Sequence, residues 1–251
     1  MRMPGFVGVL MAAGLFLPYL GWAEISRAKA IFASSEGPTV VVETPDSSAP
    51  THRNHQPTSP KTEAANQTEP QRERYIGFSY WVELIDGDGE HTCVTTDRVF
   101  QRSDRMRLNI MSNWNGYLYV VNLTSTGRSQ VFFPHPAVSA GNNLIGANTL
   151  YEAPPDAHIR CDDTSGEEAI WLMLSPTPLS GITLSPSPQM QALSREDTGR
   201  LAALAYLKGT NRLLLEVDTS SPQPASYVVA PLSMLESSGE IISLQVRLRH
   251  E

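Results

Sequence analysis

One segment of this chain, residues 99–134, has the pattern of three consecutive antiparallel strands joined by two polar turns. Apolar and polar residues alternate over 105–112 with the period of two that a half-buried strand requires. Residues 113–116, Asn-Trp-Asn-Gly, supply a turn, because Asn and Gly adopt a positive φ at low cost. Aromatic and β-branched residues then fill 117–123, and a third short strand follows over 130–133. Strands this close in sequence usually pair as a meander, so the segment predicts an antiparallel β fold.

The order of motifs along this segment resembles a known family. D-R-M-R-L at 104–108 is followed by N-W-N-G-Y-L-Y-V-V at 113–121, by V-F-F-P at 131–134 and by N-N-L-I-G-A at 142–147. This order is similar to that of the bacterial domain of unknown function 4384 family, from about residue 80 to residue 178. The resemblance implies a secreted or envelope-associated β domain. The family has no established catalytic residues, so the resemblance implies none here.

The rest of the chain predicts further short strands and a single helix. Residues 78–86 alternate and run into Asp-Gly-Asp-Gly at 86–89, which is a strong hairpin signal. Ser194 is a helix N-cap, a helix is predicted near 195–208, and Gly209 ends it. About nine or ten short strands at this spacing predict an all-β, antiparallel β-sandwich with one accessory α-helix. A partly open β-barrel is the alternative.

The N-terminal region is predicted to lie outside the folded domain. Residues 1–23 have the positive start, apolar core and small-residue cleavage site of a signal peptide. Residues 24–74 are rich in Pro, Ser and Thr, which predicts a disordered linker, and the folded domain is expected over 75–251. No later segment is apolar enough to cross a bilayer, so we expect an exported protein, periplasmic or extracellular, without a transmembrane segment after cleavage.

Two cysteines, Cys93 and Cys161, are the only ones in the chain. An even pair in an exported protein predicts a disulfide, which would tie an early strand to a later one. Two separate buried thiols are the alternative, because a buried thiol behaves as a small apolar side chain.

Three carboxylates form the candidate metal site. Asp86, Asp88 and Glu90 alternate with glycines in the predicted hairpin turn, and oxygen ligands of this kind suit Ca²⁺. The competing interpretation is a plain hairpin turn, since no later carboxylate completes a calcium loop. Calcium is the one cofactor that the sequence suggests.

Trp114 is the candidate for an exposed binding contact, with Asn115 and Tyr117 beside it. A large aromatic residue is unusual in a turn, and aromatic faces stack on sugars and peptides. The competing interpretation is that these aromatic residues belong to the core, because most aromatic residues of this chain occupy strand positions.

The expected function rests mainly on the absence of catalytic motifs and on the net charge of the chain. The sequence has no G-x-S-x-G, no H-E-x-x-H and no phosphate-binding glycine loop. Its net charge of −7 argues against nucleic acid as a partner. We expect a non-enzymatic, exported interaction or structural module of the bacterial cell envelope, whose partner is an envelope protein or a cell-surface polymer. A carbohydrate- or calcium-binding domain is the alternative, and a hydrolase is less favoured.

Overall fold

The fold is described from a computed structural model of the 251-residue chain. It describes residues 26–34, 73–86, 88–124, 128–161, 165–180, 184 and 191–251. The predicted signal peptide, residues 1–23, and most of the predicted linker lie outside these residues. Both therefore stay predictions, apart from the short segment 26–34.

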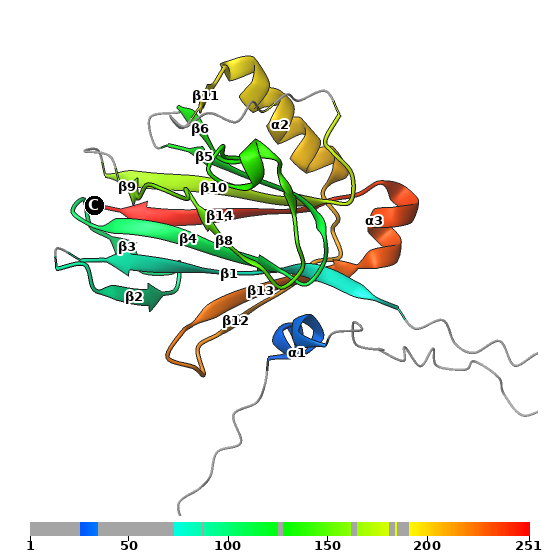
Figure 1. The fold of residues 1–251 in the computed structure, drawn as a ribbon, viewed down its shortest axis with the longest axis horizontal. Helices are drawn as coiled ribbons and strands as arrows, with labels where there is room; N and C mark the ends of the chain where they lie inside the picture. Colours follow the sequence, from blue (N-terminus) through cyan, green and yellow to red (C-terminus); the bar gives the residue numbers. More distant parts are fainter. Residues whose placement is uncertain are drawn as a thin grey trace, which may run out of the picture.

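Two seven-stranded sheets pack face to face (Figure 1). The first sheet has the order β12 (Leu214–Asp218), β13 (Ala225–Pro231), β1 (Tyr75–Ile85), β4 (Arg105–Ser112) and β8 (Leu150–Ala153), with β2 (His91–Val94) paired to β1 and β9 (Ile159–Arg160) to β4. The second has the order β11 (Gln191–Leu193), β6 (Ser129–Phe133), β5 (Gly116–Leu123), β10 (Gly166–Ser175), β14 (Ile242–His250) and β3 (Val99–Phe100), with β7 (Leu144–Ile145) paired to β5. Only the short β14–β3 pair among the described strands is parallel. The predicted all-β sandwich is confirmed, and the sheets do not close into a barrel.

The predicted meander is only half correct. β5 and β6 pair as expected, but β4 belongs to the first sheet and β5 to the second. The turn at 113–115 is therefore a corner between the sheets. Asn113 fixes this corner, because its side-chain oxygen accepts a hydrogen bond from the Gly77 amide at 2.8 Å and so holds the end of β4 against β1. Alternation along the sequence identifies each strand but does not say which sheet it joins.

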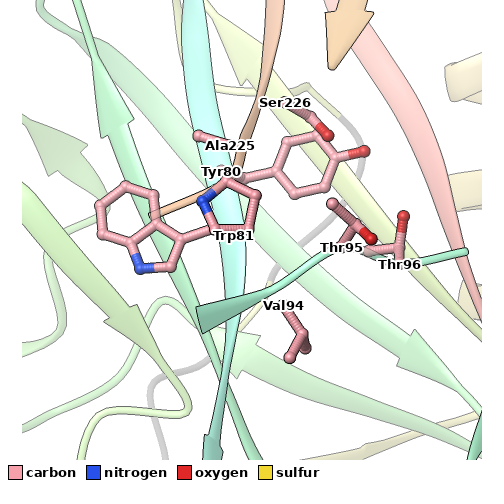
Figure 2. A pocket seen from close by; sticks show the side chains of 8 residues that line it. Tyr80, Trp81, Val94, Thr95, Thr96, Ala225 and Ser226 are labelled. Atoms are coloured by element: carbon pink, nitrogen blue, oxygen red, sulfur yellow. The ribbon is translucent and has the colours of Figure 1, made fainter. Parts of the chain in front are cut away.

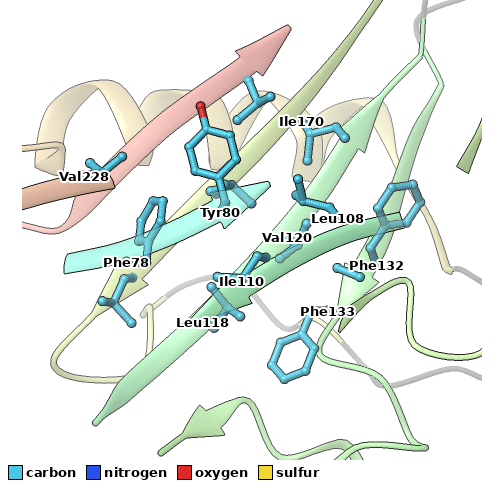
Figure 3. Close-up of a cluster of buried hydrophobic side chains, with 14 of the residues drawn as sticks. Phe78, Tyr80, Leu108, Ile110, Leu118, Val120, Phe132, Phe133, Ile170 and Val228 are labelled. Carbon is cyan, nitrogen blue, oxygen red and sulfur yellow. The ribbon is translucent and has the colours of Figure 1, made fainter. Parts of the chain in front are cut away.

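The main hydrophobic core fills the space between the sheets. Figure 3 shows side chains of both sheets meeting there, among them Phe78 of β1, Leu108 of β4 and Val120 of β5. All three are fully buried. Because alternate residues of a strand point to opposite faces, each strand places one half of its residues in this core.

Helices cover the two outer faces. α2 (Arg195–Lys208) spans the predicted residues, and its Leu201 packs on Tyr119 and Val121, which point outward from the second sheet. Ser194 caps this helix as expected, since its hydroxyl accepts a hydrogen bond from the Asp197 amide at 3.0 Å. None of the helices within the described residues has the length and apolar character that crossing a bilayer requires.

Two helices were not predicted. α3 (Leu232–Ser238) follows β13 directly and closes one end of the sandwich (Figure 1). α1 (Arg27–Ala33) lies on the outer face of the first sheet, against β12 and β13. The described residues therefore form three α-helices, where one was expected. Both of the unpredicted helices are seven residues long and depend on tertiary contacts, because isolated helices of this length are unstable in water.

The linker prediction is wrong for the residues of α1. Ala28, Ile31 and Phe32 are buried against Val229 of β13. Their spacing of three and four residues places them on one face of the helix, which is the face that packs on the sheet. The polar side of α1 is fixed as well, because Lys29 forms an ion pair with Asp218 of β12.

Candidate functional site

The three predicted calcium ligands lie at the β1–β2 turn. One carboxylate oxygen of Asp86 accepts hydrogen bonds from the backbone amides of Asp88 and Glu90, both at 2.9 Å. Asp86 thus closes its own turn, as the hairpin interpretation expected. Among the described residues, no group of three or more His, Cys, Asp and Glu side chains is arranged to hold a metal ion. Calcium binding stays a prediction that a titration tests.

The three predicted contact residues do not form one surface. Trp114 is half-buried and packs against the core between the sheets, whereas Tyr117 packs on the other side of the second sheet. Asn115 is exposed, and its side-chain oxygen accepts a hydrogen bond from the Ala147 amide at 2.7 Å. The prediction of an exposed Trp114 is therefore wrong. The corner between the sheets folds its indole over the end of the core, beside Gly116, where a Cβ atom would lie 3.4 Å from the indole.

The structure contradicts the predicted disulfide between Cys93 and Cys161. Cys93 lies opposite Glu83 on the outer face of the first sheet, whereas Cys161 points into the core between the sheets. Two strands, β1 and β4, separate β2 from β9, which places the cysteines about 14 Å apart at the usual spacing between strands. A disulfide needs Cα atoms within about 7 Å of one another. The alternative of two separate thiols therefore describes this pair, although only Cys161 is buried and Cys93 is partly exposed.

A depression beside Tyr80 is bordered by hydroxyl side chains, among them those of Thr96 and Ser226 (Figure 2). Hydrogen bonds from Ser226 and Thr96 reach the Tyr80 phenol, but burial is the larger influence and raises its pKa above the ordinary value. The depression has no interior space for a water molecule. It therefore belongs to the packing between β13 and β2 and offers no room for a ligand.

A different cavity is lined by residues of β5, β6, β9 and β10. In the ribbon, β9 lies near the C-terminus and far from α3 (Figure 1). Here the inner face of the second sheet changes from apolar to polar. Asn122 of β5, Glu168 of β10 and His250 of β14 share the strand faces that carry Val120, Ile170 and Leu248 deeper in the core. The exposed fractions of the three polar residues are 4%, 1% and 4%. Three polar side chains thus occupy positions where the strand pattern places apolar ones.

These three side chains contact one another. The Asn122 amide nitrogen donates a hydrogen bond to Glu168 Oε2 at 3.0 Å, and His250 Nε2 lies 3.7 Å from Glu168 Oε1. Two buried atoms, Asn122 Oδ1 and His250 Nε2, have no hydrogen-bond partner among the described residues. A buried polar atom without a partner costs about 1–3 kcal/mol, so native proteins normally supply a water molecule or ligand at such a position.

The cavity that Asn122 and Glu168 line has a volume of about 300 Å³, and we call it the end pocket. His250 lies behind Glu168 and is not part of the pocket lining. Gln130 and Thr124 add neutral polar groups to its lining, and Phe132 and Ile159 add apolar walls. Arg128 and Arg160 provide its positive charge, and His158 adds an imidazole. The end pocket thus combines acceptors, donors and apolar surface, as small-molecule binding sites do.

Arginines of β4 and β9 lie together on the outer face of the first sheet, next to the end pocket. Arg160 lies directly opposite Arg105 in the β4–β9 pair, although like charges in this position are destabilising. Burial lowers the pKa of His158 below its ordinary value, and the nearby charges of Arg107, Arg105 and Arg160 lower it further. Glu152 and Glu83 pair with Arg107, at 2.9 and 3.9 Å, and Arg105 donates to the Asp86 carbonyl oxygen at 2.8 Å, so part of this positive charge is compensated.

A second cavity of about 280 Å³ adjoins the end pocket, because Arg128 and Gln130 line both. Arg195 and Thr198, at the start of α2, line its far side. The two cavities therefore adjoin at Arg128 and Gln130, and each has an arginine of its own, Arg160 in the end pocket and Arg195 in the second cavity.

None of the residues of the end pocket was among the predicted site residues, and the sequence favoured a solvated acidic turn over an ion site at Glu168. A signal was present in the strand pattern. Glu168 falls on the same alternation as Ile170 and Leu172, and Asn122 on the same alternation as Leu118 and Val120. A polar residue on the apolar side of an otherwise regular strand marks either a strand end or a site.

Comparison with known proteins agrees with the motif order in the sequence. The family model described as Domain of unknown function (DUF4384) matches residues 99–178. Searches of curated proteins and of solved structures returned no match. The matched region includes Asn122 and Glu168 of the end pocket and stops before His250. The predicted resemblance is therefore confirmed: residues 99–178 of this chain match the DUF4384 family.

Proposed function

We propose that this protein is a non-enzymatic, exported interaction module of the bacterial cell envelope, and that it binds its partner through the end pocket. The observation that carries the proposal is a buried acceptor, Asn122 Oδ1, that has no hydrogen-bond partner among the described residues and belongs to a side chain lining a cavity of about 300 Å³. A sandwich that needed only stability would carry an apolar side chain at this position.

Binding fits the lining of the end pocket better than hydrolysis does. Among its described lining residues, Glu168 is the single carboxylate. Glycoside hydrolysis normally uses two carboxyl groups on either side of the scissile bond. Asn122 and Gln130, which also line the pocket, donate and accept hydrogen bonds but do not transfer protons at neutral pH. The lining therefore supports recognition of a polar group.

Export and location rest on the N-terminal sequence. Residues 1–23 carry the signal-peptide pattern, which directs the domain to the periplasm or the cell exterior. The partner in that compartment is an envelope protein or a cell-surface polymer that presents a polar group to the end pocket.

Co-sedimentation with isolated cell-envelope fragments tests this proposal. We expect the purified protein to sediment with the fragments, and the variants R160A and E168Q to remain largely in the supernatant. R212A is the matched control, because Arg212 is exposed near the β14 end where α3 lies, away from the end pocket. Equal sedimentation of R160A, R212A and the unmodified protein would refute the end pocket as the binding site.

A further inference from the structure

We infer that the end pocket binds an acidic sugar unit, a ring that carries one carboxylate and several hydroxyl groups, within a cell-surface polymer. This inference rests on the proposed function and names the class of ligand that the same site takes. It follows from three properties of the cavity: its positive side, its buried acceptors and its continuation into a second cavity.

The positive side matches a carboxylate. Arg128, which directly precedes β6, and Arg160 of β9 line the end pocket. Arginine binds carboxylates through two parallel hydrogen bonds, which fixes the orientation of the bound group.

The buried acceptors match hydroxyl groups. Asn122 Oδ1 has no donor among the described residues, and Glu168 presents carboxylate oxygens in the same lining. A hydroxyl donates to such oxygens and also accepts from a neighbour, so sugar hydroxyls suit a lining that mixes Asn, Gln, Thr and Glu side chains. Glu168 accepts a hydrogen bond from the Asn122 amide and lies beside the His250 imidazole, so a sugar hydroxyl would join an existing polar group.

The apolar walls and the second cavity favour a sugar polymer. Phe132 and Ile159 supply apolar surface for the C–H groups of a ring, as aromatic side chains do in many sugar sites. Arg128 and Gln130 lie between the two cavities, and Arg195 lines the second one. A polymer with one carboxylate per unit would place its next acidic group near Arg195.

Three small probes separate the parts of this inference. Galacturonate has a carboxylate and hydroxyl groups, galactose has hydroxyl groups without the carboxylate, and acetate has the carboxylate alone. We titrate each into the purified protein and follow binding by ligand-observed NMR. We expect binding of galacturonate, with galactose and acetate each at least about tenfold weaker. R160A is expected to weaken galacturonate binding about tenfold, and R212A to leave it unchanged.

A galacturonate trimer tests the second cavity. We expect the trimer to bind more tightly than the monomer. The variant R195A should weaken the trimer and leave the monomer unchanged, because Arg195 lines only the second of the two cavities. An equal effect of R195A on both probes would refute the two-cavity arrangement.

Other outcomes decide against the inference. Acetate binding as tightly as galacturonate would show a simple anion site, and binding of glycine or of a poly-glutamate peptide in preference to galacturonate would show a peptide or amino-acid site. Each overturns the acidic sugar. If envelope sedimentation depends on Arg160 while galacturonate does not bind, the proposed function stands and only the sugar class fails. If sedimentation does not depend on Arg160, both fail.

Discussion

Replacing Asp218 by asparagine tests how α1 is held on the first sheet. Asp218 is 6% exposed at the end of β12, where one carboxylate oxygen pairs with Lys29 of α1. The other oxygen accepts hydrogen bonds from the Ser220 amide at 2.9 Å and from the Ser220 hydroxyl. The hydrogen bond from Lys29 is the largest cause that lowers the pKa of Asp218, and the hydrogen bonds from Ser220 come next. Together they lower this pKa from 3.8 to about 2.

The lowered pKa gives the size and the sign of the effect. A pKa difference of this size corresponds to about 2.4 kcal/mol at 1.36 kcal/mol for each pH unit, and the partial exposure of Lys29 reduces it to about 1–2 kcal/mol. The folded-state pKa of Asp218 lies below the unfolded value. Its contribution to stability is therefore fully present above about pH 4 and disappears as the pH falls through about 2.

Urea denaturation at pH 7 and near pH 2.5 measures this contribution. At pH 7 we expect D218N to unfold about 1–2 kcal/mol more easily than the unmodified protein, and we expect the difference to shrink near pH 2.5. D156N is the matched control, because Asp156 is an exposed aspartate in a loop between β8 and β9. K29A should match D218N at pH 7, and the two losses should not add in the double variant.

A pH-independent loss for D218N, or an equal loss for D156N, would refute this reasoning. Additive losses in the double variant would show that Lys29 and Asp218 act separately. Hydrogen exchange at the Ala28 amide, which donates to Glu216 Oε2 at 2.7 Å, reports whether α1 itself has undocked.

Three further predictions concern the sandwich itself. G77A should prevent stable folding, because a Cβ atom there would lie 1.8 Å from the Val228 carbonyl oxygen. G199A, which lies in open space on α2, should stabilise the protein by about 0.5–1 kcal/mol and so raise the midpoint of thermal unfolding. D86A should reduce the stability of the fold by about 1 kcal/mol in a thermal melt, because Asp86 hydrogen-bonds its own turn. The loss should be the same with added calcium and with chelator, and a loss seen only with calcium would contradict this role. C93S should change stability by less than about 1 kcal/mol under non-reducing conditions, whereas losing a disulfide would cost about 2–5 kcal/mol.

Much of the local structure was predictable because it depends on nearby residues. Alternation identified β4, β5 and β6 to within one residue, and the Ser194 cap located α2 at Arg195–Lys208. Both signals act over a few residues, through the pleat of a strand and the unsatisfied amides of a helix start. The order of motifs also indicated the family that matches residues 99–178.

The candidate site was not predictable in the same way. Asn122, Glu168 and His250 lie on three strands, and nothing in their sequence spacing shows that β10 pairs with both β5 and β14. Trp114 was misjudged for a related reason: a turn residue is exposed in a hairpin but half-buried at a corner between sheets.

The sequence by itself determined where the strands and α2 lie and that the fold is all-β, because side-chain period and capping are local properties. Only the tertiary structure decided which sheet each strand joins, that Cys93 and Cys161 face opposite sides of the first sheet, that α1 docks on β12 and β13, and that polar side chains meet in the end pocket. Each of these depends on contacts between residues far apart in the chain, and their free energy arises only when the two sheets pack together.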